Sequence, residues 1–141
     1  MDKNGKKLAI FAHSGTYDKL YQTVTIAVTA ASMGRDVYMF LFFWALKRFV
    51  EEGGLETMDF PPEYGEEGPA LGQRMKALNP TSLQDMLDEV KKTGKIKVYA
   101  CSASVKYMGL DDKKVMGKVD EVVGLPVILQ MAEDSDVQLF I

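Results

Sequence analysis

Short apolar runs alternate along this chain with segments of helical periodicity. The apolar runs are the expected strands, and they lie at residues 8–12, 37–42, 96–100, 119–123 and 137–141. An apolar run without polar alternation is typical of a strand that is buried on both faces. Strands and helices that alternate in this way build βαβ units around a mostly parallel sheet. The sequence therefore predicts an α/β fold with helices on both faces of the sheet.

Apolar residues at helical spacing fill the intervals between these strands. The longest such segment runs from Tyr17 to Ala31, and Gly34 follows it as a C-terminal stop. Thr81, with Gln84 three residues later, forms the pattern of a capping box at the start of another helix. Shorter helices are expected at residues 43–51, 102–108, 111–116 and 126–131.

Residues 55–72 differ in composition from the rest of the chain, because prolines, glycines and glutamates lie close together there. This composition predicts a mobile loop. Helical order is expected to resume at Leu71. No linker long enough to separate two cores is present, so we expect a single domain over residues 1–141 with this loop as an insertion.

The charge balance and the length of the apolar runs exclude two classes of partner. Seventeen Lys and Arg residues stand against twenty Asp and Glu residues, which gives a net charge of −3. Such a chain has no broad positive field, so nucleic acid is not an expected partner. The apolar runs are shorter than the roughly 20 residues of a membrane helix, which predicts no transmembrane segment. No signal-peptide pattern follows the basic N-terminus, so we expect a cytoplasmic protein.

The chain has one cysteine, Cys101, and one histidine, His13. A single cysteine excludes an intrachain disulfide and a zinc site made of several cysteines. A single histidine excludes a histidine-rich metal centre. We therefore expect neither a bound metal nor a disulfide framework.

The aromatic run at residues 40–44 is typical of a strand buried on both faces. We interpret it as core. Any surplus apolar surface would be buried against another subunit.

Cys101 lies at the end of the third predicted strand, just before a predicted helix. Ligands of open α/β sheets gather at the carboxyl ends of the strands. A thiol at a helix start faces unpaired backbone N–H groups and the positive end of the helix dipole, and both favour the thiolate. Ser102 and Ser104 offer hydroxyls to a sulfur anion, and Lys106 adds a positive charge one turn beyond Ser102. The alternative is a buried cysteine that serves only for packing.

His13 and the following Ser14-Gly15-Thr16 lie at the end of the first predicted strand. A Cys–His dyad would need a ring nitrogen of His13 within hydrogen-bond reach of the sulfur. If another strand lies between their two strands, the backbones are roughly 10 Å apart. Ser14, Gly15 and Thr16 could bind an anion through backbone N–H groups. The favoured interpretation is that Ser14 or Thr16 caps the following helix.

Three stretches carry a more specific pattern. They read FAHSGTYDKLYQTVTIAVTAASMGRDVYMF, FFWALKRF and VYACSASVKYMGL, and the chain closes on VDEVVGLPVILQMAEDSDVQLFI. The second is similar to a Phe-x-Phe-Trp-Gly-Leu motif, and the third to a strand followed by Ala-Cys-x-x-Ser and Met-Gly-Leu. Together these stretches resemble the DsrE/DsrF-like sulfur-transfer superfamily, in particular its DsrE-like subgroup, whose members are often labelled peroxiredoxin-related.

The resemblance implies a three-layer α/β/α fold around a five-stranded, mainly parallel sheet, and assembly into homo-oligomers such as trimers. It implies that Cys101 carries a persulfide or a related sulfur group, and that the second strand lies between the strands of His13 and Cys101. Two positions depart from the family pattern. Ala45 replaces the glycine of the Trp-Gly-Leu stretch, and a second cysteine of some relatives is missing. Sulfur transfer between two thiols of one chain is therefore excluded.

The leading hypothesis is a sulfur carrier or sulfurtransferase. Cys101 would accept sulfane sulfur from a donor, hold it as a persulfide or thiosulfonate, and pass it to the thiol of an acceptor. The donor and acceptor would be other proteins or small sulfur compounds, and no cofactor is needed. Two alternatives stay open. One is a non-catalytic oligomeric binding or scaffold protein with an inert Cys101, and the other is a monothiol protein that reduces peroxides, for which the Cys-x-x-Ser pattern is weak support.

Overall fold

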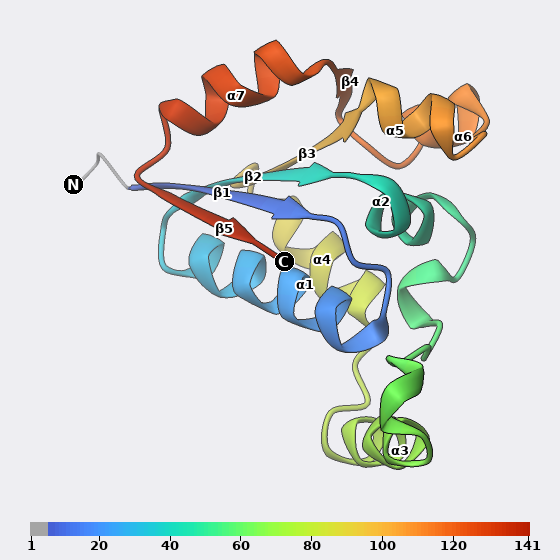
Figure 1. The fold of residues 1–141 in the computed structure, drawn as a ribbon. Helices are drawn as coiled ribbons and strands as arrows, with labels where there is room; N and C mark the ends of the chain where they lie inside the picture. Colours follow the sequence, from blue (N-terminus) through green and yellow to red (C-terminus); the bar gives the residue numbers. More distant parts are fainter. Residues whose placement is uncertain (1–5) are drawn as a thin grey trace.

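A computed structural model describes residues 6–141 and shows a five-stranded sheet with helices on both faces (Figure 1). The order across the sheet is β4-β3-β2-β1-β5, and every neighbouring pair is parallel. The expected α/β fold with a parallel sheet is thus confirmed. The strands are β1 (Lys7–Ala12), β2 (Asp36–Leu41), β3 (Ile96–Cys101), β4 (Glu121–Val123) and β5 (Val137–Phe140).

The helices form a layer on each side of the sheet and a group at its carboxyl edge. On one face lie α1 (Tyr17–Ser32) and α4 (Leu83–Lys91), and α7 (Leu125–Glu133) lies over the other face (Figure 1). At the carboxyl ends of the strands lie α2 (Phe43–Val50), α5 (Ser102–Tyr107) and α6 (Asp112–Met116). None of the helices in the described part of the chain is long and apolar enough to cross a membrane.

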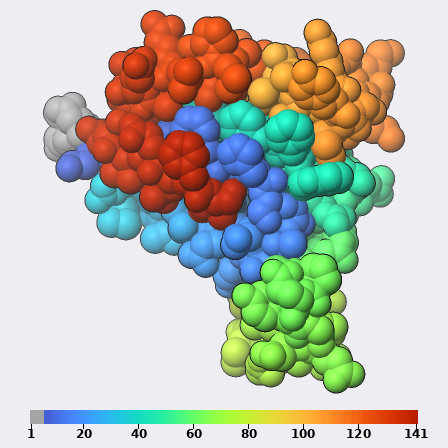
Figure 2. Space-filling model, in the orientation of Figure 1, coloured from blue at the N-terminus to red at the C-terminus, as the bar shows by residue number. Residues whose placement is uncertain are grey.

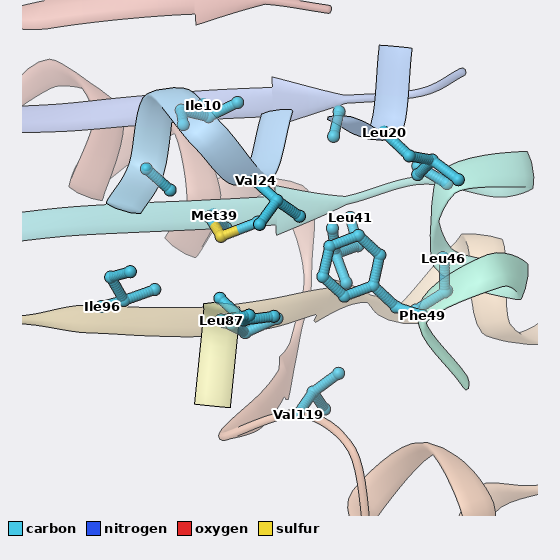
Figure 3. Close-up of a cluster of buried hydrophobic side chains, with 14 of the residues drawn as sticks. Ile10, Leu20, Val24, Met39, Leu41, Leu46, Phe49, Leu87, Ile96 and Val119 are labelled. Atoms are coloured by element: carbon cyan, nitrogen blue, oxygen red, sulfur yellow. The ribbon is translucent and has the colours of Figure 1, made fainter. Parts of the chain in front are cut away.

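The core is divided into two clusters by the sheet, because neighbouring strand residues point to opposite faces. Residues such as Ile10, Met39 and Ile96 pack on the side of α1 and α4, where Leu20, Val24 and Leu87 meet them (Figure 3). The cluster on the other face is smaller and largely aromatic. Its buried members are Ala9, Phe11, Phe40, Phe42, Cys101, Val123, Ile128 and Ala132.

The segment at residues 55–72 contains more helix than its composition predicts. It begins with the 3₁₀ turns η1 (Gly54–Glu56) and η2 (Pro62–Tyr64). The helix α3 (Glu67–Leu78) follows, and it begins at Glu67 instead of at the expected Leu71. Gly68 and Gly72 explain the difference. A Cβ at Gly68 would lie 2.8 Å from the Cβ of Phe60, so these glycines let α3 pack tightly on an aromatic side chain. The α3 region stands out as a lobe from the rest of the molecule (Figure 2).

The helix after this lobe is capped differently from the expectation. Ser82, and not Thr81, is the N-cap residue of α4, and its Oγ accepts a hydrogen bond from the Asp85 amide at 3.1 Å. The amide of Gln84 donates to Glu56 Oε2 at 3.0 Å. The predicted capping box is therefore wrong by one residue. The Gln84 amide, which that pattern assigned to Thr81, is bound instead by the distant carboxylate of Glu56.

Candidate functional site

Cys101 lies where three helices begin. It is the last residue of β3 and the N-cap residue of α5. In the sheet it pairs with Val123 of β4, and the next residue, Gly124, is the N-cap of α7. On the other side Ala100 pairs with Leu41 of β2, and Phe42 is the N-cap of α2. The amino ends of α2, α5 and α7, which are the positive ends of the helix dipoles, therefore follow three adjacent strand ends at the level of this cysteine.

The side chain of Cys101 is buried, with 4% of its surface exposed. It belongs to the aromatic cluster between the sheet and α7. Tyr99 lies two residues earlier on the same face of β3. Burial, followed by the nearby Tyr38, Asp120 and Glu121, raises the pKa of the Tyr99 phenol above its usual value of 10.0. This phenol is therefore neutral at physiological pH.

Ser104 adds an unusual feature beside Cys101. Its side chain is 1% exposed, and its Oγ is buried without any hydrogen-bond partner. Ser104 is the third residue of α5. The amide at this position is one that the side chain of an N-cap residue normally binds. Buried hydroxyls in folded proteins are normally paired, so the Ser104 hydroxyl is an exception and its proton is free to be donated.

The other two candidates on α5 lie differently. Ser102 is partly buried, and its Oγ lies 3.9 Å from the point where a Cβ at Gly124 would stand, so Ser102 lies next to the N-cap residue of α7. Lys106 is exposed and belongs to the last turn of α5, at the end opposite to Cys101. The structure thus brings Ser102 and Ser104 to the start of α5 and leaves Lys106 at its far end.

His13 does not reach Cys101. The strand β2 lies between β1 and β3, as the family resemblance implied, so the two residues follow strands that are not neighbours. The exposed His13 ring instead stacks on Phe42, with ring centroids 4.5 Å apart and an interplanar angle of 6°. Phe42 itself belongs to the cluster of Cys101. The imidazole therefore contacts the cluster of Cys101 through the Phe42 ring.

Ser14, Gly15 and Thr16 form the turn before α1, but no side chain of this turn caps the helix. Ser14 Oγ accepts a hydrogen bond from the Thr16 amide at 3.4 Å and pairs with Thr16 Oγ1 at 3.1 Å. Thr16 is the N-cap residue and makes no side-chain bond to the helix. The first amide of α1, that of Tyr17, donates to the carbonyl oxygen of Asp59 at 2.6 Å. The cap predicted from Ser14 or Thr16 is therefore supplied by the backbone of Asp59.

The turn lines a hollow of about 300 Å³ together with Trp44, Lys47, Arg48 and Asp59. Cys101 is not among the lining residues of this hollow. The predicted site residues thus fall into two groups, one at the end of β1 and one at the end of β3. Among residues 6–141 there is no cluster of three or more His, Cys, Asp or Glu side chains that could hold a metal ion.

The comparisons with known proteins agree with this fold. The family model for the DsrE/DsrF-like family matches residues 6–140. The chain belongs to this family. It is 27% identical to the sulfur carrier protein DsrE2 of Allochromatium vinosum, over 96% of this chain and 98% of that protein. It is also 27% identical to the uncharacterized protein YrkE of Bacillus subtilis, and the alignment covers both chains completely.

A solved structure shows the same fold at low sequence identity. The protein of unknown function MTH1491 from Methanobacterium thermoautotrophicum superposes with a TM-score of 0.58 at 10% identity. The match covers 96% of this DsrE/DsrF-like chain and 99% of the other chain. At this identity the likeness concerns the fold alone.

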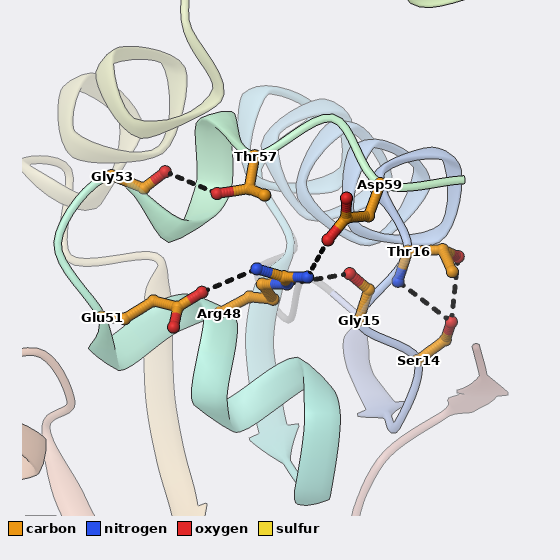
Figure 4. Close-up of polar contacts among 8 residues, drawn as sticks. All are labelled: Ser14, Gly15, Thr16, Arg48, Glu51, Gly53, Thr57 and Asp59. Carbon is orange, nitrogen blue, oxygen red and sulfur yellow. Dashed lines mark hydrogen bonds and ion pairs between the residues drawn. The ribbon is translucent and has the colours of Figure 1, made fainter. Parts of the chain in front are cut away.

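Arg48 ties the turn before α1 to two other segments (Figure 4). Its Nε donates to the carbonyl oxygen of Gly15 at 3.3 Å. Its Nη1 pairs with Glu51 at 2.8 Å, and its Nη2 pairs with the carboxylate of Asp59. A Cβ at Gly15 would lie 2.9 Å from the Cβ of Trp44, so only glycine lets this turn approach α2 so closely. The periodicity of the sequence carries no signal for this long-range contact.

We expect Arg48→Ala to lower the free energy of unfolding by about 1–3 kcal/mol, because it removes charge-assisted hydrogen bonds and releases Asp59 from its place at the start of α1. Lys47→Ala is the matched control. It removes an exposed amine that lies 5.9 Å from the Trp44 ring centroid, so its effect should stay below about 0.5 kcal/mol. Urea denaturation of the three proteins measures both changes. Equal stability of the two variants would contradict the role given to Arg48.

Proposed function

We propose that this protein is a sulfur carrier that holds sulfane sulfur on Cys101 as a persulfide. The observation that carries the proposal is the place of Cys101 as the N-cap residue of α5, whose third residue, Ser104, has a buried and unpaired hydroxyl. Family membership supports it, and so does the similarity to a relative named a sulfur carrier protein.

The proposed transfer consists of two thiol exchange steps. The Cys101 thiolate attacks the sulfane sulfur of a donor persulfide, the S–S bond of the donor breaks, and the donor thiolate leaves. In the second step the thiolate of an acceptor attacks the outer sulfur, and Cys101 leaves as a thiolate. With tetrathionate as donor, the first attack releases thiosulfate and leaves a thiosulfonate group on Cys101. Each step transfers sulfur with its electrons balanced, so no cofactor is required.

The surroundings of Cys101 suit an anionic sulfur adduct. A buried anion needs hydrogen-bond donors in place of water. The amide groups at the start of α5 and the Ser104 hydroxyl can supply such donors, and the aromatic cluster keeps water away from the adduct. Access is the second requirement. Because Cys101 is 4% exposed, donor and acceptor reach the sulfur only when the side chains that cover it move aside.

Cys101 is the only cysteine, so a relay must pass between separate molecules. The proposed partners are a sulfur donor and a thiol acceptor, each a protein or a small sulfur compound. We also propose that the chain associates with itself, as a trimer or a larger assembly. Exposed apolar side chains support this, among them Trp44, Leu125, Leu129 and Phe140. A cytoplasmic location stays a prediction of the sequence.

The burial of Cys101 favours a second candidate function, a non-catalytic oligomeric scaffold in which this thiol only fills space. Cys101 lies within a cluster of buried apolar residues, and a free cysteine in such a place packs as a small apolar side chain. The two candidates differ in one property, the reactivity of Cys101 in the folded protein.

Incubation of the folded protein with polysulfide, thiosulfate or tetrathionate tests the proposal. We expect mass spectrometry to show added sulfur on the peptide of Cys101, and we expect Cys101→Ser to remain unmodified. Later addition of a small thiol should remove the adduct and return the original mass. A folded protein whose Cys101 stays unmodified with every donor would support the scaffold. Peroxide consumption that depends on Cys101 and a thiol reductant, without sulfur loading, would support the peroxide-reducing alternative.

Ser104→Ala separates the role of this hydroxyl in the adduct from a role in folding. The substitution removes a buried hydroxyl that has no partner, so the free energy of unfolding should stay the same or rise by up to about 1 kcal/mol. The lifetime of the loaded sulfur should nevertheless fall several-fold, because the adduct loses a donor.

The control for this experiment is Ser102→Ala, which alters a partly buried hydroxyl at the same helix start. Loaded protein is followed by mass spectrometry over time, and stability by urea denaturation. If Ser104→Ala shortened the lifetime of the adduct no more than Ser102→Ala does, the role assigned to Ser104 would be wrong.

A further inference from the structure

An apolar groove with a volume of about 400 Å³ lies at the amino end of the sheet, between α1 and the first residues of β1 and β5. Leu8 and Val137, which pair across β1 and β5, form one wall. Ile26 of α1 and Met33, the C-cap residue of that helix, form the other wall, and Met33 is 63% exposed. Cys101 ends its strand at the opposite edge of the sheet, so this groove is separate from the proposed sulfur site.

The rim of this groove is positively charged although the chain as a whole is acidic. Lys6, Lys7 and Arg35 stand around it, and none of the described residues that line it is acidic. Thr25 of the α1 wall donates its hydroxyl to the carbonyl oxygen of Tyr21 at 2.7 Å, so the hydroxyl is satisfied within the helix. The groove therefore matches an occupant that is apolar along its length and carries carboxylates.

The helix α7 has the complementary properties. Leu125 and Leu129 are 51% and 56% exposed, and with Glu133 they follow one another at intervals of four residues, which places them on one face of the helix. Asp134 extends the acidic end. None of the residues of α7 is basic. With nine residues, α7 is about 13 Å long, which fits the roughly 16 Å that α1 and its C-cap residue span from Gln22 to Met33 along the groove.

We propose that α7 of one copy of this chain docks in the α1 groove of the next copy. Leu125 and Leu129 would cover Ile26 and Met33, and Glu133 and Asp134 would lie against the cationic rim. The proposal rests on the self-association proposed above and names its surfaces. Because α7 and α1 cover opposite faces of the sheet, the contact joins two different surfaces (Figure 1). Such a head-to-tail contact closes into a ring when the rotation between copies permits it.

Two surface variants test this contact, one on each side of it. Leu129→Asp alters α7 and leaves the groove intact, and Met33→Asp alters the groove and leaves α7 intact. Both positions are more than half exposed, so the core is untouched. We expect the wild-type protein to be larger than a monomer by light scattering coupled to size exclusion. Each variant alone should be a monomer, and an equal mixture should form a dimer and nothing larger, because one intact contact remains.

Leu78→Asp is the matched control, since Leu78 is 85% exposed on α3 and lies outside both surfaces, and it should assemble as the wild type does. Circular dichroism checks folding, and Leu125→Asp replaces the α7 variant if that variant does not fold. A monomeric wild type would overturn the contact and the self-association together. A wild type that assembles, with either variant assembling as well or with a mixture that stays monomeric, would overturn the contact alone. Sulfur loading of Cys101 is a separate measurement and stands or falls independently of these results.

Discussion

Parallel pairing in a fixed register decides where the helices at the carboxyl edge begin. Because β2, β3 and β4 run side by side in the same direction, the chain leaves all three at one edge and enters α2, α5 and α7 there. The pairing of Cys101 with Val123, and of Ala100 with Leu41, sets these three exits at one level. The amino ends of three helices thus follow the strand ends at the level of Cys101.

The same packing that places the thiol also covers it. Cys101 is 4% exposed within the cluster between the sheet and α7, and this cover would protect the proposed adduct but would also slow its exchange. The exposed apolar face of α7 links these two effects, since Ile128 and Ala132 pack toward the sheet while Leu125 and Leu129 point away. A second copy that binds the outer face of α7 would act on the helix that covers the sulfur. Self-association and access to Cys101 would then depend on one element.

The sequence was sufficient for those features that depend on local pattern. Apolar runs and helical spacing predicted the alternation of strands and helices, and the position of Cys101 at a strand end followed from the run before it. The features that were missed depend on contacts between distant residues. The carbonyl of Asp59 caps α1, Glu56 binds the amide of Gln84, and Arg48 joins the turn at Gly15 to two segments far along the chain. The unpaired hydroxyl of Ser104 was a candidate by position, but its burial follows from the packed structure alone.

The proposed sulfur-carrier function depends most on whether Cys101 reacts in the folded state. The most direct measurement is the rate at which a small alkylating reagent labels Cys101 across a series of sub-denaturing urea concentrations. If the sulfur becomes accessible through local movement of its cover, labelling in the absence of urea will be much faster than global unfolding and nearly independent of urea. A labelling rate that equals the rate expected from global unfolding at every urea concentration would show that this thiol is inert core.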